Sequence, residues 1–178
     1  ILPDYSVTDP QLTFKLPKKI TAVSGIDAFS QSVESFWNVN ANVESLSYST
    51  EAIKLIFDNL TKAVNDPDED SRIKMSRAAH LAGKAINITK TTGPHAMSYY
   101  LTSQFGISHG QAVCITLGEF LMFNYEVTDS ETNGGKTANQ IKENLDELIK
   151  LSGCREPMEL KDKIQELIRS IGLKTNLN

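Results

Sequence analysis

The chain has 178 residues, of which 40% are hydrophobic and 22% charged, and its formal net charge is −4. This length suits one domain with a core of ordinary size, and a mildly acidic chain without clustered positive charge is not expected to bind nucleic acid. No apolar run approaches the roughly 20 residues of a bilayer span, and no signal pattern opens the chain, so we expect a cytoplasmic protein without membrane contact. Cys114 and Cys154 form no paired motif and are predicted to be free thiols.

Residues 1–18 contain three of the six prolines and some strand-like alternation. This composition indicates an extended linker with at most one short strand. The chain has no initiator methionine and stops just beyond a predicted helix, so we expect it to be a piece of a longer protein.

Residues 19–178 form the predicted domain, in which apolar residues recur at three-to-four spacing. This periodicity predicts about seven helices and no central strand, and therefore an all-α, bundle-like domain. The segment 109–125 is apolar almost all round and is expected to be buried. The predicted helices cover residues 25–37, 43–64, 68–89, 94–104, 109–125, 137–151 and 156–171, with a polar loop at 128–136.

Four polar side chains are candidates for chemistry. Asp27 and Gln31 lie four residues apart, so they share one helix face. His95 follows a Gly-Pro helix start, and His109 follows the glycine at the next break. Imidazoles near the starts of successive helices can point into one cleft and hold a metal, although on their own such histidines are more often simply packed and hydrogen-bonded.

The motif GIDAFSQ, followed later by GPHAMSYYLTSQFGISHG, resembles the iron-containing (group III) alcohol dehydrogenase family. The resemblance covers nearly the whole chain and implies the family's helical C-terminal domain, which is of the dehydroquinate synthase-like type. It places Asp27, His95 and His109 on three of the family's metal ligands and implies a divalent metal, Fe²⁺ or Zn²⁺. Gln31 stands where the family usually has a fourth, histidine ligand, and an amide oxygen is a weaker donor than imidazole.

The segment KAINITKTTGPHA looks like the branch of the family that reduces phosphonoacetaldehyde. This resemblance implies an anionic substrate, for which Lys90 and Lys84 are candidate ligands; the alternative is that both are solvated residues at a helix end. Tyr99, four residues after His95, stands where many members carry a histidine near the nicotinamide. Its phenol is a candidate catalytic hydrogen-bond donor.

By resemblance, the whole protein transfers hydride between NAD(H) or NADP(H) and a small aldehyde or alcohol, and forms a homodimer. An N-terminal nucleotide-binding domain is expected to precede residue 1 and to bind most of the cofactor, and a last helical segment is expected after residue 178. The fragment alone should be inactive. Two alternatives stay open: a lyase-type relative on the same scaffold, and a non-catalytic helical interaction domain.

Overall fold

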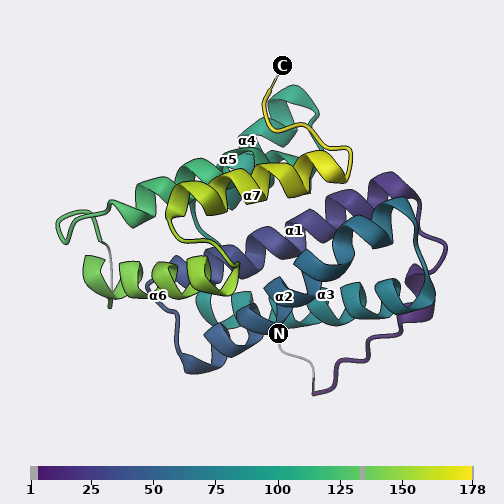
Figure 1. Cartoon of the computed structure of the whole chain (residues 1–178), viewed down its shortest axis with the longest axis horizontal. Coiled ribbons are helices and arrows are strands. Elements are labelled where there is room, and N and C mark those ends of the chain that lie inside the picture. Colours follow the sequence, from purple (N-terminus) through teal and green to yellow (C-terminus); the bar gives the residue numbers. More distant parts are fainter. Residues whose placement is uncertain (1–3, 133–134, 178) are drawn as a thin grey trace.

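The structure, a computed structural model, describes residues 4–132 and 135–177, and in these ranges the fold is all-α. Seven α-helices and one 3₁₀ helix occur there, without a strand, as the periodicity predicted (Figure 1). The loop expected at 128–136 is described except at residues 133–134. The elements are η1 (Pro10–Thr13), α1 (Lys18–Trp37), α2 (Val43–Asn65), α3 (Glu69–Thr89), α4 (Gly93–Phe105), α5 (His109–Tyr125), α6 (Ala138–Leu151) and α7 (Pro157–Ser170).

The N-terminal region differs from its prediction in two respects. The described part of the linker contains no strand, because Pro10 starts a 3₁₀ turn that the Asp9 side chain caps by accepting from the Gln11 amide at 3.0 Å. The first α-helix starts at Lys18, seven residues before the predicted start. Gly25, the first residue of the predicted helix, lies inside α1, where a Cβ would come 2.3 Å from the Cδ1 atom of Leu60. The glycine therefore serves close packing between α1 and α2.

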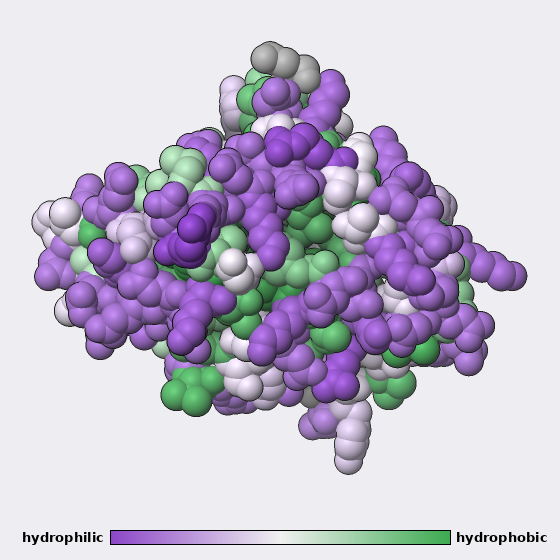
Figure 2. Space-filling model, in the orientation of Figure 1, coloured by the Kyte–Doolittle hydropathy of each residue, from purple (hydrophilic) through white to green (hydrophobic). Residues whose placement is uncertain are grey.

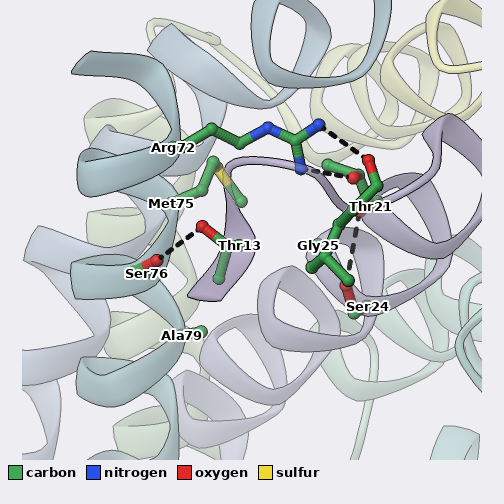
Figure 3. A pocket seen from close by; sticks show the side chains of 9 residues that line it. Thr13, Thr21, Ser24, Gly25, Arg72, Met75, Ser76 and Ala79 are labelled. Atoms are coloured by element: carbon green, nitrogen blue, oxygen red, sulfur yellow. Dashed lines mark hydrogen bonds between the residues drawn. The ribbon is translucent and has the colours of Figure 1, made fainter. Parts of the chain in front are cut away.

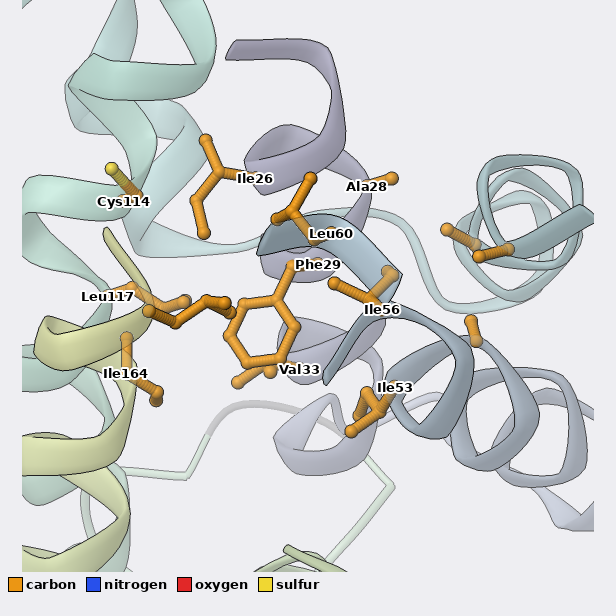
Figure 4. Packing of buried hydrophobic residues seen from close by; sticks show 14 of the residues in the cluster. Ile26, Ala28, Phe29, Val33, Ile53, Ile56, Leu60, Cys114, Leu117 and Ile164 are labelled. Atoms are coloured by element: carbon orange, nitrogen blue, oxygen red, sulfur yellow. The ribbon is translucent and has the colours of Figure 1, made fainter. Parts of the chain in front are cut away.

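Helix α1 is the central element, packed against α2, α3, α5 and α6. Its Phe29 ring is fully buried and meets the Phe57 ring of α2 edge-on, with 5.0 Å between the centroids. Figure 4 shows Phe29 between apolar side chains of α1, α2, α5 and α7. The core is thus built around one helix, and side chains on α1 hold fixed positions relative to every helix that packs on it.

Several buried serines make α1 unusually polar for a central helix. Ser30, Ser32 and Ser35 each donate to the carbonyl four residues earlier, at 2.9, 2.9 and 3.0 Å. These bonds satisfy the hydroxyls within the helix, so they are buried without an unpaired donor. The small side chains also allow neighbouring helices to approach closely.

The boundaries of the other six α-helices lie within one residue of those predicted. Capping boxes begin three of them, with Asn42 at α2, Asp68 at α3 and Thr137 at α6. Helix α4 ends at Gly106, whose φ of 66° is left-handed and turns the chain sharply into α5. That turn brings the starts of α4 and α5 to the same side of α1.

The surface seen in Figure 2 is largely hydrophilic, and apolar residues show mainly in a hollow across its middle. Helix α5 is less buried than its composition predicted, since Phe123 is 56% exposed. Both cysteines are free thiols, as expected. None of the helices in the described ranges is long and apolar enough to cross a membrane.

Candidate metal centre

Three helices bring together the acidic and imidazole side chains that the motifs singled out. Asp27 lies in the middle of α1, His95 in the first turn of α4 and His109 at the first residue of α5. One ligand atom from each side chain lies within 4.8 Å of the other two. Asp27, His95 and His109, which are far apart in the sequence, therefore form a compact cluster in the fold.

The oxygen Asp27 Oδ1 is the point on which the cluster converges. It lies 3.3 Å from His95 Nε2 and 3.7 Å from His109 Nε2, and the two imidazole rings face each other edge-on with 5.4 Å between centroids. Two imidazole nitrogens and a carboxylate oxygen are a donor set that suits Zn²⁺ and Fe²⁺. The His109 side chain is 42% exposed, so the cluster is accessible to solvent beside this ring.

Two atoms of this cluster are buried without a hydrogen-bond partner. Asp27 Oδ1 and His95 Nε2 are both inaccessible to solvent, and although they are close, they are not aligned as donor and acceptor. Burying unpaired polar atoms costs roughly 1–3 kcal/mol each. A cation between them would satisfy both, so the residues present fit a divalent metal.

Glu34 is a fully buried carboxylate on the same face of α1, seven residues after Asp27. It accepts hydrogen bonds from the backbone amide and the hydroxyl of Thr92, at 2.5 and 2.7 Å, and its other oxygen contacts Nδ1 of His95. An ionised carboxylate only accepts hydrogen bonds, so Nδ1 of His95 carries a hydrogen. When the His95 ring is neutral, as metal binding requires, its lone pair is therefore on Nε2. Carboxylates in this position fix the ring orientation of metal-binding histidines.

Sequence reasoning did not identify Glu34. Its place two helical turns after Asp27 was a usable signal, because residues seven apart lie on one helix face. The partner that makes it informative, Thr92, is 58 residues away in the sequence. Only the fold shows that the carboxylate lies beneath His95 rather than in solvent.

The segment before α4 is tied to the end of α1. The indole of Trp37 donates to the Thr92 hydroxyl at 2.9 Å, and the amide of Asn38 donates to the carbonyl of Lys90 at 3.3 Å. With the bonds of Glu34, these contacts fix the start of α4 and therefore the position of His95. The first turn of α4 is thus set by side chains of α1.

Burial and the neighbouring carboxylates act in opposite directions on the pKa of His95. Burial lowers the pKa, but the carboxylates of Asp27 and Glu34 beside its two nitrogens outweigh this effect and raise the pKa to about 9. In the metal-free protein, His95 is therefore expected to be protonated at neutral pH. The acidic surroundings that hold a proton there would also hold a metal cation.

Helix α5 reaches the centre because Gly110 has no side chain. A Cβ at this position would lie 2.1 Å from the backbone oxygen of Val23, so any larger residue would push the start of α5 away from α1. Ser98 lies 3.2 Å from Nδ1 of His109, a second contact that positions this ring. Beside these residues is an open pocket of about 230 Å³, lined by Ile20, Val23, Ser24, Asp27, His109 and Gly110.

The other predicted site residues lie at different places around this centre. Gln31 is one turn after Asp27, and its amide nitrogen donates to Asp27 Oδ2 at 3.1 Å. Tyr99 is exposed, and the centroid of its ring lies 6.1 Å from the centroid of the His109 ring. Lys90 is the residue that follows α3, close to Thr92 in the chain, whereas the Lys84 ammonium lies 3.9 Å above the ring of Tyr48 on α2.

A family profile described as "Fe-containing alcohol dehydrogenase family, C-terminal" matches residues 21–178. Among curated proteins, phosphonoacetaldehyde reductase from Streptomyces viridochromogenes is 30% identical over 174 residues, which cover 97% of this chain and 44% of that protein. Long-chain-alcohol dehydrogenase 1 from Geobacillus thermodenitrificans is 41% identical over 118 residues, covering 66% of this chain and 30% of that protein.

Solved structures give the same result. The sulfoacetaldehyde reductase from Bifidobacterium kashiwanohense, determined in complex with NAD⁺, superposes with a TM-score of 0.82 at 35% identity. The match covers 95% of this chain and 42% of that one. The chain thus spans less than half the length of these relatives.

The raised pKa of His95 predicts how stability depends on pH without metal. Because the folded pKa of about 9 exceeds the ordinary value of 6.5, this group stabilises the fold fully below pH 6.5 and loses its contribution as pH rises through 9. Denaturant unfolding in the presence of a chelator should show the free energy of unfolding falling across this range. His95→Gln should remove most of the slope, and an equal slope in both proteins would contradict the prediction.

Proposed function

The chain belongs to the Fe-containing alcohol dehydrogenase family, and we propose that it is the metal-binding domain of an NAD(P)-dependent aldehyde reductase. The observation that carries the proposal is the meeting of Asp27, His95 and His109, with two buried atoms that lack a partner. These atoms, together with the family membership, favour this function over a lyase or a non-catalytic interaction domain.

In this proposal Asp27, His95 and His109 hold the metal, and Gln31 is the fourth candidate, through its amide oxygen. Its amide nitrogen now donates to Asp27 Oδ2, so ligation would require the amide to turn over. A bound Fe²⁺ or Zn²⁺ would supply a Lewis acid for the carbonyl oxygen of the substrate. Glu34 holds His95 in the orientation and tautomer that ligation needs.

The substrate side of the centre is the exposed side. The His109 side chain is 42% exposed, and Tyr99 lies next to it with its ring open to solvent. The Tyr99 hydroxyl is proposed to donate a hydrogen bond to the substrate. Hydride would pass between the nicotinamide and the carbonyl carbon, with NAD(H) or NADP(H) bound mainly by a domain outside these residues and the whole protein forming a homodimer.

A backbone outlier supports an anionic substrate. Lys90 is the one non-glycine residue with positive φ in the described ranges, and its φ of 68° and ψ of 176° fall in a region used almost only by glycine. Such strain costs on the order of 1–3 kcal/mol. A lysine at a place where glycine would be unstrained indicates that its side chain has a use.

The use proposed for Lys90 is to bind the charged end of the aldehyde. Two of the relatives are named for phosphonoacetaldehyde and sulfoacetaldehyde. Both aldehydes carry an anionic group on the carbon next to the carbonyl carbon. An ammonium can hold either group by charge and hydrogen bonding. Lys84 is the weaker candidate because its ammonium already lies over an aromatic ring.

Removal of the histidine ligands tests the proposed centre. His95→Ala and His109→Ala in the full-length protein should each lower bound metal and reduce aldehyde-dependent NAD(P)H oxidation by at least about a hundredfold, as expected when a ligand is lost. Metal content by elemental analysis and steady-state kinetics measure the two effects. His80→Ala is the matched control and should change neither. Unchanged metal content in both ligand variants would refute the assignment.

Lys90 is tested by a pair of variants that separate strain from charge. Lys90→Gly should raise the free energy of unfolding by about 1 kcal/mol, because glycine adopts this backbone without strain. Lys90→Ala keeps the strain and should not stabilise. Both should raise KM for phosphonoacetaldehyde or sulfoacetaldehyde about tenfold or more and leave KM for a neutral aldehyde unchanged. Equal effects on charged and neutral aldehydes would exclude the proposed role.

A further inference from the structure

A cavity lined by both apolar and polar residues lies on the side of α1 that faces the N-terminal segment and α3 (Figure 3). Its volume is about 100 Å³, equivalent to a few water molecules. The residues of the metal centre do not line it. Its polar lining consists of hydroxyl groups and one guanidinium, from Thr13, Thr21, Ser24, Ser76 and Arg72.

Arg72 is the unusual member, because its charge is buried and only 4% of the residue is exposed. Nη1 donates to the Thr21 hydroxyl at 2.5 Å and Nη2 donates to the carbonyl of Leu16 at 3.1 Å, whereas Nε has no partner. A guanidinium has five N–H donors. These two bonds leave three donors without an acceptor in the described part of the chain.

Arg72 also lacks a counter-charge. None of the carboxylates in the described ranges lies within 4.0 Å of its guanidinium, and both of its acceptors are neutral. Burial lowers the pKa of the guanidinium, the direction expected for a desolvated cation without a compensating anion. Burying an unpaired charge costs several kcal/mol, so charged side chains inside proteins are normally paired.

The polar groups of the cavity suit an anion rather than a cation, because the wall contains no acidic residue. The hydroxyls of Thr13, Thr21 and Ser24 already donate to backbone carbonyls, so the donors left for a ligand are the free N–H groups of Arg72 and the hydroxyl of Ser76. Ser76 Oγ lies 3.4 Å from the Thr13 hydroxyl, a long contact that it can exchange for a new acceptor. The planar donors of arginine match the oxygens of a carboxylate or a phosphate.

We propose that this cavity binds a small oxyanion, a carboxylate or an inorganic phosphate, on the free N–H groups of Arg72 and the hydroxyl of Ser76. The bound anion would neutralise the buried guanidinium. Because Arg72 also holds the carbonyl of Leu16, and Ser76 contacts Thr13, the anion would strengthen the attachment of residues 13–16 to α1 and α3. This site is independent of the proposed metal centre and of the aldehyde reductase function.

The simpler reading is that Arg72 only tethers the N-terminal segment through its two neutral bonds. The two readings differ in one measurable respect, since only a binding site makes the stabilisation by an anion depend on Arg72 and on the space in the cavity. Ligand that binds the folded state alone raises the free energy of unfolding with the logarithm of its concentration once that concentration exceeds Kd. General salt effects of phosphate also stabilise proteins, but they do not depend on one residue.

The test is thermal unfolding of the full-length protein, titrated with sodium formate or sodium phosphate at constant ionic strength. The wild type should show a rise of several degrees in Tm that grows with the logarithm of the anion concentration, and the more effective anion identifies the oxyanion class. Ala79→Leu places a larger side chain on the exposed edge of the cavity without touching Arg72, and it should abolish the rise. Arg72→Met should also abolish it.

Arg77→Met is the matched control, because Arg77 is an exposed residue of α3 paired with Glu51, and it should respond as the wild type does. If Arg72→Met fails to fold, Ala79→Leu still decides the question. The proposal is overturned if the Tm of the wild type does not rise with either anion, or if Ala79→Leu shows the same rise as the wild type.

Discussion

The buried carboxylate of Glu34 is the constraint on which the arrangement of this domain depends. It lies in the central helix, and its two oxygens meet the start of α4 and the ring of His95. Removing it would leave the Thr92 amide and hydroxyl and the His95 Nδ1 atom without an acceptor in the interior. One side chain therefore couples the packing of α4 on α1 to the geometry of the candidate metal centre.

Much of the fold follows from local patterns in the sequence. Apolar periodicity located all seven helices, and six of them ended within one residue of their predicted bounds, because caps and turn residues are local signals. The start of α1 was predicted at Gly25, seven residues too late, and the packing of Leu60 against this glycine is visible only in the folded chain. Long-range contact, not local preference, decided that position.

The site could be predicted in part for the same reason. Asp27, His95 and His109 stood out through their motifs, and the structure brings them together. Glu34 and Arg72 carried no comparable signal, because an acidic or basic residue on a helix is usually solvated. Their importance comes from burial: each is enclosed by segments distant in sequence, and its partners are visible only in the folded chain.

The unpaired buried polar atoms and the strained backbone, which destabilise the domain locally, occur close to residues for which we propose a function. The unpaired atoms of Asp27 and His95 lie at the candidate metal centre, and the strained Lys90 lies two residues before Thr92, which binds Glu34. Well-packed apolar contacts around Phe29 offset these costs elsewhere in the same helix bundle. The guanidinium of Arg72 on α3, which lacks a counter-charge, donates to Thr21 of α1, so the central helix borders both sites.

The central claim is that Asp27, His95 and His109 bind one divalent metal. Anomalous diffraction from crystals of the full-length protein, prepared with Fe²⁺ or Zn²⁺ and measured at the absorption edge of that metal, tests it directly. A single peak is expected about 2.0–2.2 Å from an Asp27 oxygen and from Nε2 of both histidines. A peak elsewhere, or metal-replete crystals in which this cluster shows no peak, would contradict it.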